Sequence, residues 1–105
     1  MKLSLLIVTM FSILSLSAGD VLVIDVRTQG EWDSGRLENA QHIEWQNILK
    51  LSETASKDQE IYLYCRSGNR SGKAAKILQE NGFNQAINAG SISEASDLLN
   101  LKIID

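Results

Sequence analysis

Short apolar runs alternate with amphipathic stretches along most of this chain. Residues 21–26 (VLVIDV) form an almost continuous β-branched run, which is typical of a strand covered on both faces. Further strands are expected at residues 40–43, 60–64 and 85–88, with an edge segment at 101–104. Helical spacing predicts helices at residues 28–34, 45–52, 71–81 and 93–99. This alternation predicts an α/β domain with a parallel sheet of four to five strands and helices on both faces.

Local signals support several of these helices. Thr28 is followed three residues later by Glu31, which is the spacing of a capping box. One α-helical stripe should face the core in the second helix, formed by Trp45, Ile48, Leu49 and Ser52. Four apolar residues of the third helix should also point inward: Ala74, Ala75, Ile77 and Leu78. Gly82 then stands where a left-handed C-terminal cap is expected.

The first residues have the layout of a secretory signal peptide. Lys2 precedes an apolar run at residues 3–16, and small residues follow it. The run is shorter than the roughly 20 apolar residues of a membrane span. We therefore expect a signal peptide over residues 1–18, cleaved within 17–19, and a mature domain over 19–105. The mature protein would be periplasmic, or secreted from a cell with one membrane, without stable membrane association; an uncleaved anchor is the alternative.

Charge and cysteine content narrow the function classes. The net charge is −3 at pH 7 and there is no basic run, so nucleic acid is not an expected partner. One Cys and one His exclude an intrachain disulfide and make a zinc site improbable, so we expect neither metal nor cofactor. No long apolar stripe indicates an obligate partner, and a monomer is expected. A lone thiol in an exported domain calls for a functional explanation.

The segment after the third predicted strand carries the candidate chemistry. Cys65 ends that strand, and six polar or glycine residues follow: Arg66, Ser67, Gly68, Asn69, Arg70 and Ser71. Ligands of parallel α/β sheets bind beyond the carboxyl ends of the strands, which is where this loop lies. Gly68 and Asn69 tolerate positive φ, so the loop can curl and direct several N–H groups toward one point. The start of a helix and two arginines add positive charge, and such surroundings favour a nucleophilic thiolate.

Other interpretations of these residues were weighed. A lone cysteine is often a small buried side chain, but the residues that follow Cys65 are too polar for a core. Ser67 and Ser71 can donate hydrogen bonds to a bound sulfur, or Ser71 can be the N-cap of the helix. Asp25 and Arg27 could support the site, although a structural ion pair is the better interpretation.

The loop from Cys65 to Ser71 (CRSGNRS) resembles the active-site loop of rhodanese (thiosulfate sulfurtransferase) domains. Residues 24–27 (IDVR) with 31–32, Gly35 and Ala40 resemble the first signature of that family, and residues 88–90 (NAG) resemble its last segment. The resemblance covers about residues 21–100 and is to the single-domain, periplasmic type. Three positions depart from the family pattern: Arg36 replaces a usual His, Glu44 a common Pro, and Ser91 a second Gly.

This resemblance implies a sulfurtransferase with a covalent intermediate. Cys65 would attack the outer sulfur of an anionic donor such as thiosulfate, and sulfite would leave. The Cys65 persulfide would then pass its sulfur to cyanide or to a thiol. The resemblance assigns catalysis to Cys65 and substrate binding to the rest of the loop, residues 66–71, without cofactor or metal.

Three rival functions were considered. Cysteine-based phosphatases and arsenate reductases use a Cys-x5-Arg loop, whereas only four residues separate Cys65 from Arg70 here, which predicts a smaller cradle. Some rhodanese-like domains are non-catalytic sulfide-sensing or interaction modules, but these usually lack the cysteine. A thiol-disulfide oxidoreductase is disfavoured because the chain has no Cys-x-x-Cys motif.

Overall fold

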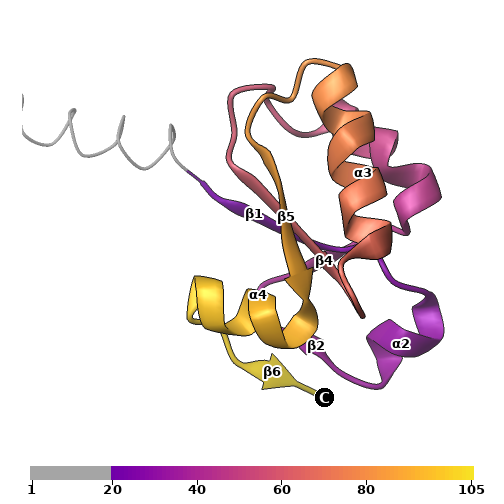
Figure 1. The fold of residues 1–105 in the computed structure, drawn as a ribbon, viewed down its shortest axis with the longest axis vertical. Helices are drawn as coiled ribbons and strands as arrows, with labels where there is room; N and C mark the ends of the chain where they lie inside the picture. Colours follow the sequence, from indigo (N-terminus) through magenta and orange to yellow (C-terminus); the bar gives the residue numbers. More distant parts are fainter. Residues whose placement is uncertain (1–19) are drawn as a thin grey trace, which may run out of the picture.

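The computed structural model describes residues 20–105, and the predicted leader lies outside the described residues (Figure 1). Its elements follow one another as β1 (Leu22–Asp25), α2 (Gln29–Asp33), β2 (Arg36–Leu37), β3 (Gln41–His42), the 3-10 helix η1 (Trp45–Glu53), β4 (Ile61–Cys65), α3 (Asn69–Glu80), β5 (Ala86–Ser91), α4 (Ile92–Leu99) and β6 (Ile103–Ile104). Within this part of the chain no helix has the length and apolar character that crossing a membrane requires.

Four strands form one parallel sheet in the order β3-β1-β4-β5, which confirms the predicted fold class. The predicted edge segment at 101–104 is present as β6, but it pairs antiparallel with β2 and stands apart from the main sheet. Helices cover both faces: α3 and η1 pack on one, and α4 packs on the other (Figure 1).

Alternation along β4 decides which face receives the cysteine. Leu63 and Cys65 belong to the core cluster shared with α3 and η1, whereas Tyr62 and Tyr64 face the cluster shared with α4. Successive side chains of a strand point to opposite faces, so this pattern is the expected one. Cys65 therefore ends the strand with its sulfur on the side from which α3 begins.

The second helix differs from the sequence prediction. It is a 3-10 helix, in which side chains repeat every three residues, so Ile48 and Leu51 are both buried. Leu49, which the α-helical stripe placed in the core, is 43% exposed, and Ser52 is exposed as well. The predicted stripe is confirmed for Trp45 and Ile48, which pack on the core, and is wrong for Leu49 and Ser52 because the period of this helix is shorter.

The carboxyl end of β5 requires a glycine. A register shift between Leu63 and Tyr64 of β4 brings Gly90 opposite Tyr64. Gly90 has φ +87, and a Cβ there would lie 2.5 Å from Oε1 of Glu94. That oxygen accepts the backbone N–H of Ser91 at 2.9 Å in the capping box of α4. The absence of a side chain at Gly90 thus leaves the space that the Glu94 carboxylate needs to cap α4.

Replacing this glycine should destabilise the fold. Gly90→Ala forces a left-handed conformation, which costs about 1–2 kcal/mol, and weakens a helix cap worth about 1 kcal/mol. We expect the free energy of unfolding, measured by urea denaturation with tryptophan fluorescence, to fall by about 2–3 kcal/mol. Gly30→Ala is the matched control, because nothing lies within 4 Å of the added carbon. Equal stability of the two variants would contradict this role of Gly90.

Candidate functional site

Hydrogen-bond donors surround the sulfur of Cys65 at the end of β4. The side chain is fully buried, and its Sγ accepts the backbone N–H of Gly68 at 3.0 Å and the hydroxyl of Ser71 at 3.3 Å. Gly68 has φ +95 and is the N-cap residue of α3, so the loop turns sharply before the helix starts. This curl confirms the expectation for Gly68. Asn69 does not share the positive φ, because it is already the first residue of α3.

Ser71 lies neither at the helix N-cap nor in an exposed loop, the two positions that its polarity predicts. It lies in the first turn of α3 rather than at the N-cap, so that interpretation is wrong. It is fully buried, which also contradicts the expectation that the loop residues stay out of the core. Its hydroxyl is within hydrogen-bonding distance of Cys65 Sγ at 3.3 Å and of the Asn88 side-chain oxygen at 2.7 Å. A single hydroxyl proton serves both acceptors in turn.

Asn88 supports the loop from the neighbouring strand β5, and sequence reasoning did not single it out as a site residue. Its side-chain oxygen accepts from Ser71 and from the N–H of Gly90 at 3.0 Å, and its amide donates to the carbonyl of Gly68 at 3.0 Å. The signal was present in the sequence, because a polar residue near the carboxyl end of a parallel strand adjoins the same sheet edge as Cys65.

These donors act against the effect of burial on the thiol. Burial alone would raise the pKa of Cys65, but hydrogen bonds from the Ser71 hydroxyl and from the backbone N–H groups of Ser71, Ser67 and Gly68 favour the thiolate. They outweigh the burial, and the pKa of Cys65 falls to about 7. About half of the protein therefore carries a thiolate at neutral pH, and that is the nucleophilic form.

The three cations near the loop have different surroundings. Arg70 donates two hydrogen bonds to the carboxylate of Glu31, NH1 to Oε1 at 2.7 Å and NH2 to Oε2 at 3.0 Å. The ammonium of Lys73 lies 5.1 Å from the ring centroid of Trp45. Arg66 is exposed and has no salt bridge within residues 20–105. Sequence spacing did not reveal the link between Glu31 and Arg70.

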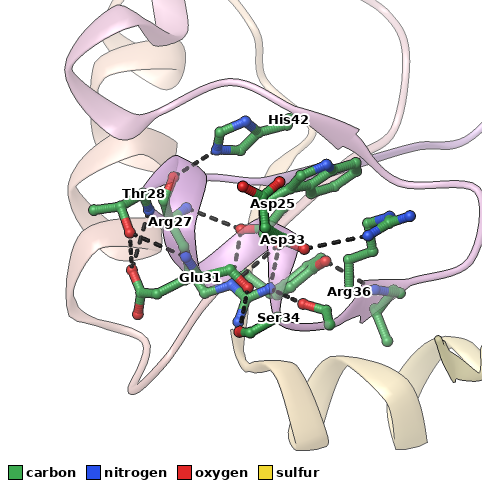
Figure 2. A network of polar contacts seen from close by, with 12 residues as sticks. Asp25, Arg27, Thr28, Glu31, Asp33, Ser34, Arg36 and His42 are labelled. Atoms are coloured by element: carbon green, nitrogen blue, oxygen red, sulfur yellow. Dashed lines mark hydrogen bonds and ion pairs between the residues drawn. The ribbon is translucent and has the colours of Figure 1, made fainter. Parts of the chain in front are cut away.

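Asp25 and Arg27 form a buried ion pair, as their structural interpretation expected (Figure 2). Arg27 Nη2 lies 2.7 Å from Asp25 Oδ2, and Nε lies 2.9 and 3.1 Å from the two carboxylate oxygens. Nη2 also donates to the carbonyl of Gly35, while His42 Nε2 lies 2.7 Å from the Arg27 carbonyl. These contacts connect the end of β1 to Gly35, which follows α2, and to His42 of β3.

A hollow on the described surface lies apart from this loop. Its volume is about 410 Å³, and it is lined by residues of β1, β4 and α4 together with Val21, Asn39 and Leu101, none of which belongs to the cysteine loop. Residues 20–105 contain no group of three or more His, Cys, Asp or Glu side chains with the geometry of a metal site. The loop after β4 is thus the site that the chemistry indicates.

Comparisons with known proteins match the family that the cysteine loop resembles. A family model described as "Rhodanese-like domain" matches residues 14–97. The chain is 36% identical over 70 residues to a sulfurtransferase of Allochromatium vinosum, covering 66% of this chain and 64% of that protein. It is 32% identical over 66 residues to the thiosulfate sulfurtransferase GlpE of Coxiella burnetii, covering 63% and 62%. The matches span 52–64% of the length of the first curated relatives, which is less than two thirds.

Solved structures show the same fold. A rhodanese-like domain protein from Staphylococcus aureus superposes with a TM-score of 0.66 at 30% identity, covering 86% of this chain and 87% of that one. A rhodanese from E. coli, described with anions, superposes with a TM-score of 0.71 at 23% identity, covering 82% and 99%.

The lowered pKa predicts how the reactivity of Cys65 depends on pH. Iodoacetamide reacts with the thiolate, so its rate should rise with pH and reach half of its maximum near the pKa of about 7. Mass spectrometry of the alkylated protein over a pH series measures this rate. A midpoint at the ordinary value of a free cysteine, about 8.5, would contradict the hydrogen-bonded thiolate.

Removing the Ser71 hydroxyl should raise the pKa of Cys65. A hydrogen bond to a charged group contributes about 1.5–3 kcal/mol, so Ser71→Ala should reduce the thiolate fraction at pH 7 by about tenfold or more. The alkylation rate measures this fraction. Ser67→Ala is the control, because the exposed Ser67 contributes its backbone N–H, which the substitution keeps. An equal effect of both substitutions would exclude a specific role of the Ser71 hydroxyl.

Proposed function

The chain belongs to the rhodanese-like domain family, and we propose that it is a sulfurtransferase that carries sulfane sulfur as a persulfide on Cys65. One observation supports this proposal most directly: the Cys65 sulfur, at the end of a parallel strand, accepts hydrogen bonds from Gly68 and Ser71. The sulfurtransferases among the relatives support the same reaction class.

The proposed donor is thiosulfate or another anionic sulfane compound. The Cys65 thiolate attacks the outer sulfur, a new S–S bond forms, and the bond between the two donor sulfurs breaks. Sulfite leaves with the electron pair of that bond. The Cys65 persulfide formed in this step is an anion at neutral pH, and we expect the N–H groups of the loop to favour it as they favour the thiolate.

The second half of the cycle returns the free thiolate. Cyanide attacks the terminal sulfur of the persulfide, the S–S bond breaks, and thiocyanate is released; a thiol acceptor would form a new persulfide in the same way. Each step exchanges one S–S or S–C bond for another, so no cofactor or metal enters the proposed mechanism. The proposed partners are small: an anionic donor and a cyanide or thiol acceptor. The exported location and the monomeric state stay predictions.

A phosphatase or arsenate reductase is the less favoured enzyme class. Such enzymes need a loop arginine that is free to clasp a tetrahedral oxyanion, whereas Arg70 is bound to Glu31 at 2.7 and 3.0 Å. The four residues between Cys65 and Arg70 also form a short loop. Turnover of p-nitrophenyl phosphate at a rate comparable to that of thiosulfate would overturn the sulfurtransferase proposal.

Cys65→Ala should abolish sulfur transfer, because no other thiol exists in the chain. We expect thiocyanate production from thiosulfate and cyanide to fall by at least about a thousandfold, as for other enzymes that lose their nucleophile. Intact mass spectrometry after incubation with thiosulfate should show the mass of one added sulfur only in the wild type.

Because Cys65 is buried, the fold of the variant must be verified by circular dichroism, and Cys65→Ser serves as a second variant of similar size. Persistent activity in both variants would exclude Cys65 as the nucleophile. If Cys65→Ala or Cys65→Ser kept the full effect of the wild type in the cell, the domain would instead be a non-catalytic module.

A further inference from the structure

The carboxylate of Glu31 is held in a fixed position beside the cysteine loop. Its Oε1 accepts the backbone N–H and the hydroxyl of Thr28, both at 3.0 Å, in the capping box of α2 (Figure 2). The same oxygen accepts from Arg70 at 2.7 Å, and Oε2 accepts from Arg70 at 3.0 Å. A five-residue helix thus presents a rigid carboxylate to an arginine that lies 39 positions later in the sequence.

This contact changes the charge at the site. Arg70 lies in the first turn of α3, next to Ser71, and its positive charge interacts with the Cys65 thiolate. The Glu31 carboxylate opposes that charge at hydrogen-bonding distance. Its pKa is lowered to about 2, chiefly by the bond to Arg70, so it stays ionised even well below neutral pH. Both side chains are about one quarter exposed, so solvent does not fully screen the pair.

We propose that Glu31 is a specificity-determining residue: it occupies the guanidinium of Arg70 and so weakens the binding of dianionic donors, thiosulfate included, more than the binding of neutral or singly charged ones. This inference rests on the proposed function, since it concerns which donor reaches Cys65. Glu31 makes no hydrogen bond to the Cys65 sulfur and acts through Arg70. It is therefore a positioning residue rather than a catalytic one. The competing explanation is that the ion pair of Glu31 with Arg70 only stabilises the packing of α2 against α3.

Glu31→Gln separates charge from structure. Glutamine can also serve at this position of a capping box, so α2 should persist while the negative charge is removed. Glu60→Gln is the matched control, because it changes the net charge equally but lies before the first residue of β4, at the strand end opposite Cys65. The remaining members of a mutant cycle are Arg70→Gln and the double variant Glu31→Gln/Arg70→Gln.

The probes are iodoacetate, which is an anion, and iodoacetamide, which is neutral. Both react with the Cys65 thiolate, so the ratio of their rates reports the local charge and cancels changes in thiolate fraction. We expect Glu31→Gln to raise the iodoacetate-to-iodoacetamide ratio by about three- to tenfold, and Arg70→Gln to lower it. The double variant and Glu60→Gln should stay near the wild type. In steady-state assays, KM for thiosulfate should fall in Glu31→Gln more than kcat changes.

Each outcome decides between the explanations. An unchanged or lower iodoacetate-to-iodoacetamide ratio in Glu31→Gln overturns the inference, because the loss of a purely structural contact would change the rates of both reagents alike. A higher ratio in a protein that forms no thiocyanate supports the charge effect of Glu31 and rejects sulfur transfer. Failure of both reagents to modify Cys65 in the wild type rejects the inference together with the proposed function.

Discussion

The hydrogen bonds donated to the Cys65 sulfur are the interaction on which the site depends. Burial of a thiol normally favours the protonated form, and Cys65 is fully buried. The donors of the following loop reverse that preference and bring the pKa to about 7. Without them the residue would be the small apolar side chain that its position in the core suggests. The same atom is thus part of the hydrophobic core and of the candidate site.

The rest of the fold holds these donors in place. The curl at Gly68 is fixed by Asn88 of β5, whose amide donates to the Gly68 carbonyl at 3.0 Å. The approach of β5 is close, because a Cβ on Gly68 would lie 3.4 Å from the Cα of Gly90. Parallel pairing of β4 with β5 brings these strand ends together, and the pairing of β4 with β1 brings Asp25 to the same edge. The site therefore depends on contacts among three separate segments of the chain: β1, β4 with the loop that follows it, and β5.

Sequence patterns predicted what is local. The capping box of Thr28 and Glu31, the left-handed Gly82 and the loop after Cys65 each depend on neighbouring residues, and all are present. The 3-10 helix was missed because its apolar positions were read with the α-helical period, whereas the segment packs beside α3 with a three-residue period. The contacts of Asn88 and Glu31 were missed for a related reason. They join residues 17 to 39 positions apart, and no local pattern records which carboxylate or amide will face a given loop.

Two of the arginines near Cys65 are held in ion pairs, and this limits how the site can attract a ligand. Arg27 is neutralised by Asp25 and Arg70 by Glu31, while the chain as a whole has a net charge of −3. Long-range attraction of an anion is therefore weak. The attraction that remains comes from Arg66 and Lys73, which are in no salt bridge within residues 20–105, and from N–H groups, whose dipoles act over a few ångströms. Such a site discriminates by fit at the sulfur rather than by capturing any anion nearby. In the proposed sulfur transfer, the group behind the transferred sulfur then matters chiefly through its charge, which meets the pair of Glu31 and Arg70.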